Sequence, residues 1–248
     1  MDEESTSPPE FSSGEFPPTR WTRVVALQAD APGQAEKALA DLCNIYWLPI
    51  YSYFRRVGRT SDDAQDLTQG LFEQMIRRGD LAKADEEKGK LRSFLLTMAK
   101  RHLVGTIRHD TTAKRGGAES PLSFDVDNAE ALHADQALND ITPDKVFDRQ
   151  WAAVTLEQTR NQLASEYTNR GRAKQYEVMS RYLSWNENAE QPYSEASKEA
   201  GLSEEAFRAA VSRMRKRFQA LLREQIADTL LEGDDIDGEI RYLFSALS

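Results

Sequence analysis

Two stretches decide the fold: residues 61–78 read SDDAQDLTQGLFEQMIRR, and residues 90–115 read KLRSFLLTMAKRHLVGTIRHDTTAKR. In the first stretch, Ser61 suits the N-cap position, and Asp62 and Asp63 follow in the first turn, where carboxylates favour the helix dipole. Apolar residues recur at helical spacing and predict one buried side: Ala64, Leu67, Leu71 and Met75. The remaining side is polar, and its simplest interpretation is a solvated helix face.

The second stretch combines an apolar stripe with a basic surface. The stripe consists of Phe94, Leu95, Met98, Ala99, Leu103 and Ile107. From Lys100 to Arg115, five Lys or Arg residues stand against one Asp, so this segment carries +4, whereas the whole chain carries −9. A basic island in an acidic chain indicates phosphate binding.

A helix-turn-helix pattern lies near the C-terminus, where residues 193–225 read YSEASKEAGLSEEAFRAAVSRMRKRFQALLREQ. Gly201 falls at the turn, and Ser203 caps the second helix, which is the one that would read DNA. Its inner face is apolar and contains Phe207, Ala210, Val211, Met214, Phe218 and Leu221. Its outer face is mostly basic, with Arg208, Ser212, Arg213, Arg215, Lys216 and Arg217.

In order and spacing these segments resemble the sigma factors of bacterial RNA polymerase, most closely the extracytoplasmic-function (ECF) type, over most of residues 42–225. DDAQDLTQGLFEQM is similar to the acidic region 2 helix, which docks on the clamp helices of the largest polymerase subunit. The resemblance implies docking by Asp62, Asp63, Asp66, Gln69 and Glu73.

LRSFLLTMAKRHLVGTIR resembles the helix that melts promoter DNA and reads the minus-ten element, with a preceding pocket, here about residues 85–91, for a flipped base. The candidate contacts are Lys88, Lys90, Arg92, Phe94, Lys100, Arg101 and Arg108. Residues 193–225 resemble region 4, which reads the minus-thirty-five element, and the resemblance also implies contact with the flap of the second-largest subunit. We expect base contacts from Arg208, Ser212 and Arg213, and phosphate contacts from Arg215, Lys216 and Arg217.

The predicted fold class is all-α, with two small helical domains joined by an acidic linker. Helix formers dominate, strand signals are scarce, and 40% hydrophobic residues suffice for small helical cores. Thr142-Pro143-Asp144 is a sharp helix start. The expected order is a disordered acidic tail (1–18), a region 2-like domain (19–115), a linker (116–141), a region 4-like domain (142–225) and a C-terminal extension (226–248).

Three further segments carry expectations of their own. A short helix is expected over residues 19–30, and a longer one over about 34–57, kinked at Pro49 and ended by Gly58. The aromatic residues of the longer helix, together with Cys43, are expected to be buried. In the C-terminal extension, Ile236, Ile240, Leu243, Phe244 and Leu247 predict an amphipathic helix. It would dock on the second domain or, in a sharper hypothesis, cover a DNA-binding or polymerase-binding surface until displaced.

No catalytic, metal or cofactor motif emerges from the residues. The three histidines and the single cysteine lack zinc spacing, and residues 233–244 fail as a calcium loop at both ends. No signal peptide or membrane-span pattern occurs, so we expect a cytoplasmic protein that is not an enzyme.

The leading interpretation is therefore a sigma factor that binds core RNA polymerase and promoter DNA. An anti-sigma factor or a kinase remains open as a further partner. Two alternatives are a stand-alone helix-turn-helix regulator and a helical adaptor or anti-sigma-like protein. The regulator leaves residues 62–75 unexplained, and the adaptor leaves residues 193–222 unexplained.

Overall fold

The computed structural model describes residues 32–78, 90–110, 141–183, 191–230 and 234–247. Within these ranges the chain forms eight α-helices and no strand, which confirms the predicted all-α fold. The helices are α2 (Pro32–Arg56), α3 (Ser61–Arg78), α4 (Leu91–Asp110), α6 (Pro143–Asn169), α7 (Ala173–Ser180), α8 (Tyr193–Glu199), α9 (Glu204–Ala227) and α10 (Ile236–Leu247). The predicted tail (1–18), the helix expected over 19–30 and the linker up to residue 140 lie outside the described residues.

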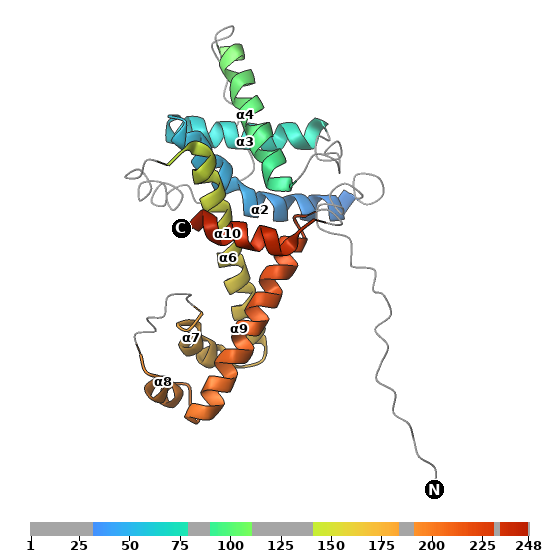
Figure 1. Ribbon diagram of the computed structural model, residues 1–248. Helices are drawn as coiled ribbons and strands as arrows, with labels where there is room; N and C mark the ends of the chain where they lie inside the picture. The colour runs from blue at the N-terminus through green and yellow to red at the C-terminus, as the bar shows by residue number, and fades with distance from the viewer. Residues whose placement is uncertain (1–31, 79–89, 111–140, 184–190, 231–233, 248) are drawn as a thin grey trace.

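The helices gather in two groups, as expected for two small helical domains (Figure 1). One group contains α2, α3 and α4, and the other contains α7, α8 and α9. The long helix α6 runs from the first group to the second, and α10 crosses near the junction. One continuous cluster of buried side chains extends through both groups. The exact domain boundaries stay a prediction.

The first group is built around the aromatic face of α2. Tyr46, Trp47, Tyr51 and Phe54 are each at most 3% exposed, so the predicted core role of this cluster is confirmed. Cys43 is buried as predicted, and burial raises the pKa of its thiol to about 12. Gly58, with φ +89°, follows the end of α2, in the left-handed conformation that glycine adopts without strain.

The start of α3 corrects one detail of the sequence analysis. Thr60, and not Ser61, supplies the capping side chain, because its Oγ1 accepts the backbone N–H of Asp63 at 3.1 Å. The Ser61 hydroxyl instead hydrogen-bonds the Tyr51 hydroxyl at 2.9 Å and ties the helix to α2. Both residues are good caps, and the hydrogen bond of Ser61 to the Tyr51 hydroxyl leaves the capping position to Thr60.

Helix α6 begins as predicted, with Thr142 accepting the N–H of Lys145 and Pro143 in the first turn. Its N-terminal half packs on α2, where Phe147 is fully buried and stacks on Tyr46. Its C-terminal half packs on α9, and Leu163 is fully buried. The residues of the predicted second domain therefore share a core with the first.

Helices α8 and α9 form the predicted helix-turn-helix. Gly201 lies in the turn at φ +69°, and Ser203 caps α9 by accepting the N–H of Ala206 at 3.2 Å. Phe207 fits between Tyr182 and Tyr193, with ring centroids 5.5 and 5.7 Å away, so two aromatic neighbours accommodate the large side chain. The exposed side of α9 is thereby fixed relative to the core.

Candidate nucleic-acid interface

The acidic residues predicted to dock on a basic partner lie along α3. Asp62, Asp63, Asp66 and Glu73 are exposed, and Gln69 is half-buried. None of the ion pairs between described residues uses Asp62, Asp63 or Asp66. Asp62, Asp63 and Asp66 thus present exposed carboxylates to solvent.

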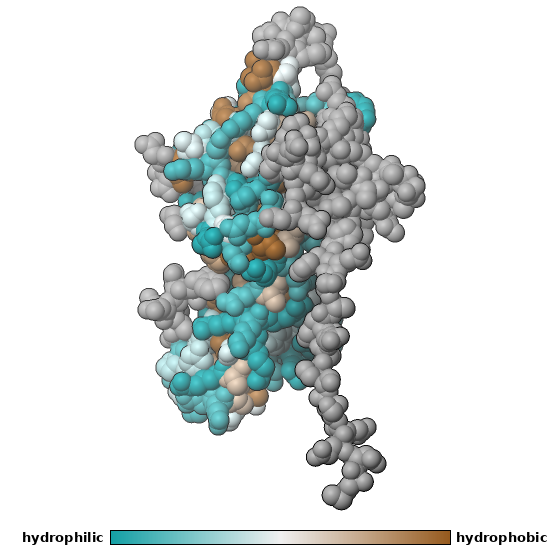
Figure 2. Space-filling view, turned by 45° about the vertical axis from the view of Figure 1, so that its right-hand side comes forward, coloured by the Kyte–Doolittle hydropathy of each residue, from teal (hydrophilic) through white to brown (hydrophobic). Residues whose placement is uncertain are grey.

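Helix α4 packs beside this acidic face and adds apolar surface to it. The two helices approach closely at Gly70, where an added Cβ would lie 3.4 Å from the His102 ring. A groove of 240 Å³ between them is lined by Arg59, Asp63, Asp66, Leu67, His102, Leu103, Thr106 and Ile107. Val104 and Ile107 are 48% and 41% exposed, and Figure 2 shows apolar patches toward the end where α4 projects. The combination of carboxylates and apolar side chains suits a protein partner.

The basic residues predicted for the minus-ten element are spread along α4 and the residue before it. Arg101 is exposed, Phe94 is half-buried against the core, and Lys100 pairs with Asp144 of α6 at 2.5 Å. Lys88 lies outside the described residues, as does the side chain of Arg108.

Lys90 and Arg92 are held by acidic residues from elsewhere in the chain. The Glu239 carboxylate of α10 accepts hydrogen bonds from Lys90 Nζ and from Arg92 Nε, the latter at 2.6 Å. Arg92 also donates to Asp148 of α6 at 3.0 Å. Burial alone would lower the pKa of the Arg92 guanidinium, but the hydrogen bond to Glu239 and the charges of Glu239 and Asp148 outweigh it and raise that pKa.

A second basic surface lies on the exposed side of α9. A groove of 480 Å³ is lined by Tyr193, Arg208, Val211, Ser212, Arg215, Lys216 and Gln219. Arg208 pairs with Glu204 at 2.7 Å and lies over the Tyr193 ring, 5.2 Å from its centroid. Arg215 donates to the Tyr182 carbonyl at 2.9 Å. The structure thus brings four predicted minus-thirty-five residues together: Arg208, Ser212, Arg215 and Lys216.

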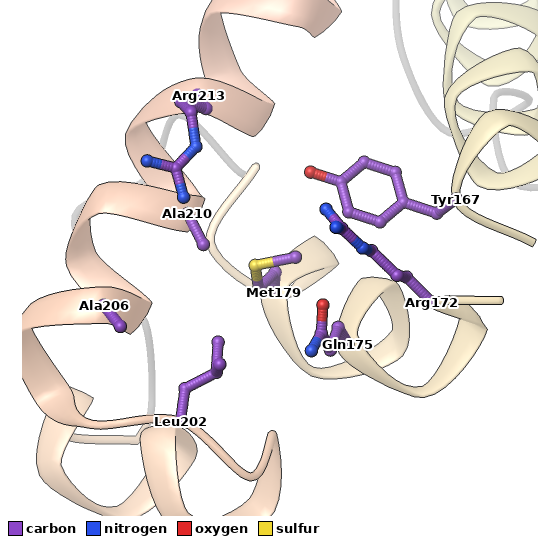
Figure 3. Close-up of a pocket in the computed structure, with 8 residues that line it drawn as sticks. All are labelled: Tyr167, Arg172, Gln175, Met179, Leu202, Ala206, Ala210 and Arg213. Atoms are coloured by element: carbon purple, nitrogen blue, oxygen red, sulfur yellow. The ribbon is translucent and has the colours of Figure 1, made fainter. Parts of the chain in front are cut away.

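The other two predicted residues of α9 face elsewhere. Arg213 lines a separate pocket with Tyr167 and Arg172, and Figure 3 shows its guanidinium pointing toward that pocket. Arg217 pairs with Glu166 of α6 at 2.6 Å and with Glu224 at 3.2 Å. Its hydrogen bond and charge lower the pKa of the Glu166 carboxyl. Arg217 therefore joins α9 to α6 in this structure.

Four residues of these surfaces were missed by the sequence analysis as partners of the basic groups: Asp144, Asp148, Glu239 and Tyr242. Asp144 and Asp148 lie at the start of α6, after the acidic linker. Their negative charge alone does not indicate which basic residue each one meets. Glu239 and Tyr242 lie on the docking face of α10, and nothing in their spacing indicates which cations they meet.

The described residues contain no group of histidine, cysteine and acidic side chains placed to hold a metal ion. Nor does any helix in the described ranges combine the length and apolar character needed to cross a bilayer. A sequence model of the family described as ECF sigma factor matches residues 54–224, which is more than half of the chain. Neither the curated proteins nor the solved structures gave a match.

Proposed function

Because the chain belongs to the ECF sigma factor family, whose members act in transcription initiation and are not enzymes, we propose a specific role for each charged surface. The family implies RNA polymerase core and promoter DNA as partners. In our proposal, the acidic face of α3 docks on the clamp helices of the largest polymerase subunit. The basic residues around α4 bind the minus-ten element, and α9 reads the minus-thirty-five element.

The proposal rests on one observation: the acidic surface of α3 and the basic surface of α9 are separate. The α3 surface presents Asp62, Asp63 and Asp66 at a groove lined by carboxylates together with apolar side chains such as Leu103 and Ile107, which suits a basic helical partner. The α9 surface presents Arg208, Arg215 and Lys216 around a groove at the reading helix, which suits the phosphate backbone and base edges of duplex DNA. A protein that bound only DNA would have no use for the first surface.

Contacts to the flap of the second-largest subunit are part of the same proposal. The pocket of Figure 3 lies on a side of α9 away from its DNA-reading groove and is lined by Met179, Leu202 and Ala210 among others. A protein bound to this concave surface, which Arg172 and Arg213 also line, would anchor the helix-turn-helix and leave the reading side of α9 free.

Gel filtration with purified bacterial core polymerase tests the docking face. Wild-type protein is expected to co-elute with the enzyme, and a variant with Asp62, Asp63 and Asp66 changed to Lys is expected to elute alone. A control variant changes three exposed residues to Lys: Glu157, Glu177 and Glu195. It alters the net charge by the same amount as the α3 variant and should still co-elute with the polymerase. Circular dichroism verifies that both variants keep their helices.

Three other outcomes have a definite meaning. If the wild type does not co-elute but binds duplex DNA tightly, the stand-alone regulator replaces the sigma factor role. If both triple variants lose binding equally, net charge and not the α3 face governs docking. If the α3 variant co-elutes like the wild type, the docking face lies elsewhere.

A further inference from the structure

Helix α10 places a buried carboxylate on two of the cations that the proposed function assigns to promoter DNA. Glu239 is 1% exposed, and its two oxygens contact Lys90 and Arg92 separately. This is the arrangement in which a phosphate group would meet the same two cations, one oxygen to each. Glu239 therefore neutralises both cations at the start of α4.

The Arg92 side chain is also closed off on its other sides. The guanidinium carbon lies 4.0 Å from the centroid of the Tyr242 ring and 5.4 Å from that of Trp151. Tyr242 of α10 also donates its hydroxyl hydrogen to Asp148 at 2.6 Å, and Asp148 in turn accepts from Arg92. The Arg92 side chain is only 12% exposed as a result. Nucleic acid cannot reach it while α10 stays in place.

Besides the contacts of Glu239 and Tyr242, helix α10 is docked by its apolar side and by an ion pair of Asp237. Leu243 is fully buried, and the helix contacts both α6 and α9, so the predicted docking on the second domain is confirmed. Asp237 pairs with Arg223 of α9. The helix thereby connects the reading helix of one group to the basic helix of the other, and its release would remove the Glu239 carboxylate from both cations and leave Arg92 paired with Asp148 alone.

We propose that α10 is an autoinhibitory helix, in which Glu239 takes the place of a promoter phosphate on Lys90 and Arg92 until the helix is displaced. This inference rests on the proposed function, because that function assigns the two cations to DNA. Displacement must precede DNA contact at this site, so the apparent affinity is reduced by the fraction of molecules in which α10 is undocked.

The test measures binding of a fluorescein-labelled, mixed-sequence, single-stranded DNA 20-mer to the full-length protein by anisotropy at several salt concentrations. Glu239→Gln keeps the shape of the side chain but removes its charge. If α10 is undocked in about a tenth or less of wild-type molecules, this variant should bind the single strand about tenfold tighter or more. Release of α10 frees Lys90 from its carboxylate but leaves Arg92 beside Asp148 of α6. The plot of log affinity against log salt should therefore steepen by roughly 0.7 if only Lys90 meets a phosphate and by roughly 1.4 if Arg92 also leaves Asp148, at about 0.7 per phosphate neutralised on a single strand.

Two controls separate release of α10 from a general change in charge. Glu157→Gln removes an exposed carboxylate from α6 and should bind like the wild type. Adding Lys90→Ala and Arg92→Ala to Glu239→Gln should abolish both the tighter binding and the steeper salt dependence. Equal affinities of wild type and folded Glu239→Gln, or an equal gain in Glu157→Gln, would overturn the proposal.

Hydrogen exchange on the wild type gives a second measurement that does not depend on a variant folding. Amides of residues 236–247 should lose protection when the single strand is added to saturation, and retained protection would overturn the proposal. Gel filtration with core polymerase distinguishes the two levels of inference. If the wild type binds polymerase but Glu239→Gln does not change the DNA affinity, only the autoinhibition proposal is rejected. If Glu239→Gln raises the DNA affinity but the protein does not bind polymerase, α10 does cover the DNA-binding cations and the sigma factor role is rejected.

Discussion

Replacing Phe147 with alanine tests whether the two helical groups form one folding unit in solution. Phe147 lies in the N-terminal half of α6, is fully buried and stacks on Tyr46 of α2 with ring centroids 6.5 Å apart. If this half of α6 stood free of α2, the ring would face solvent. The cost of removing it therefore reports directly on the packing of α6, which joins the two groups, against α2.

The expected magnitude follows from the complete burial of the ring. Truncation of a buried phenylalanine loses the transfer free energy of the ring and leaves a cavity, at a cost of about 3–5 kcal/mol in the free energy of unfolding. A substitution at an exposed position would change it by only about 0.5 kcal/mol or less. For a chain of this size the larger cost lowers Tm by roughly 6–20 °C, at about 2–4 °C per kcal/mol.

Urea unfolding, followed by tryptophan fluorescence and by circular dichroism, measures the effect. Two of the four tryptophans, Trp47 and Trp151, are buried in the first group and its contact with α6. Fluorescence of a variant with Trp21 and Trp185 changed to Phe therefore reports on that region, whereas dichroism reports on all helices. Phe207→Ala, in the core of the second group, is the matched control. A single transition shifted by both substitutions indicates one unit, and a loss below about 1 kcal/mol for Phe147→Ala would refute the packing of α6 on α2.

Three further predictions concern single side chains. Arg217 lowers the pKa of Glu166, so the Glu166 carboxylate stabilises the fold above its unfolded-state pKa of about 4.3 and loses this effect as the pH falls through its lower folded-state pKa. In urea unfolding near neutral pH, Glu166→Gln should lower the free energy of unfolding by roughly 0.5–1 kcal/mol. The difference from wild type should shrink below about pH 4. The thiol of Cys43, with its pKa raised to about 12 by burial, should not react with a thiol reagent in native protein and should react fully in denaturant; rapid native reaction would contradict its burial. Ser203→Ala removes the cap of α9 and should cost about 1 kcal/mol in urea unfolding, whereas the exposed Ser212→Ala on the same helix should cost almost nothing.

Local patterns predicted the helices themselves well. The apolar spacing of residues 61–78 and the Thr142-Pro143 start gave α3 and α6 with nearly the observed bounds. Such signals depend on neighbours within one or two turns, so a single chain reveals them. The cap of α3 shows the limit, because Thr60 and Ser61 are equally suited and only the contact with Tyr51 decides between them.

Contacts between distant segments could not be predicted in the same way. Periodicity shows that one side of α10 is buried, but it does not show that Glu239 meets Lys90 and Arg92. The sequence could have predicted in part that the candidate DNA-binding residues of α9 lie on different sides of the helix. At about 100° per residue, Arg213 lies roughly 140° around the helix from Arg208, so both could not have shared one groove.

The ribosome synthesises α4 before α10, so the contact between the two helices forms late. Lys90 precedes Glu239 by 149 residues, and at about 5–20 residues per second a ribosome needs roughly 7–30 s to make the intervening chain. Throughout that interval α4 exists without the carboxylate that neutralises it in the finished fold. A growing chain therefore presents its cations to nearby nucleic acids first and acquires its own cover last, and a chain that terminated before residue 239 would never acquire it.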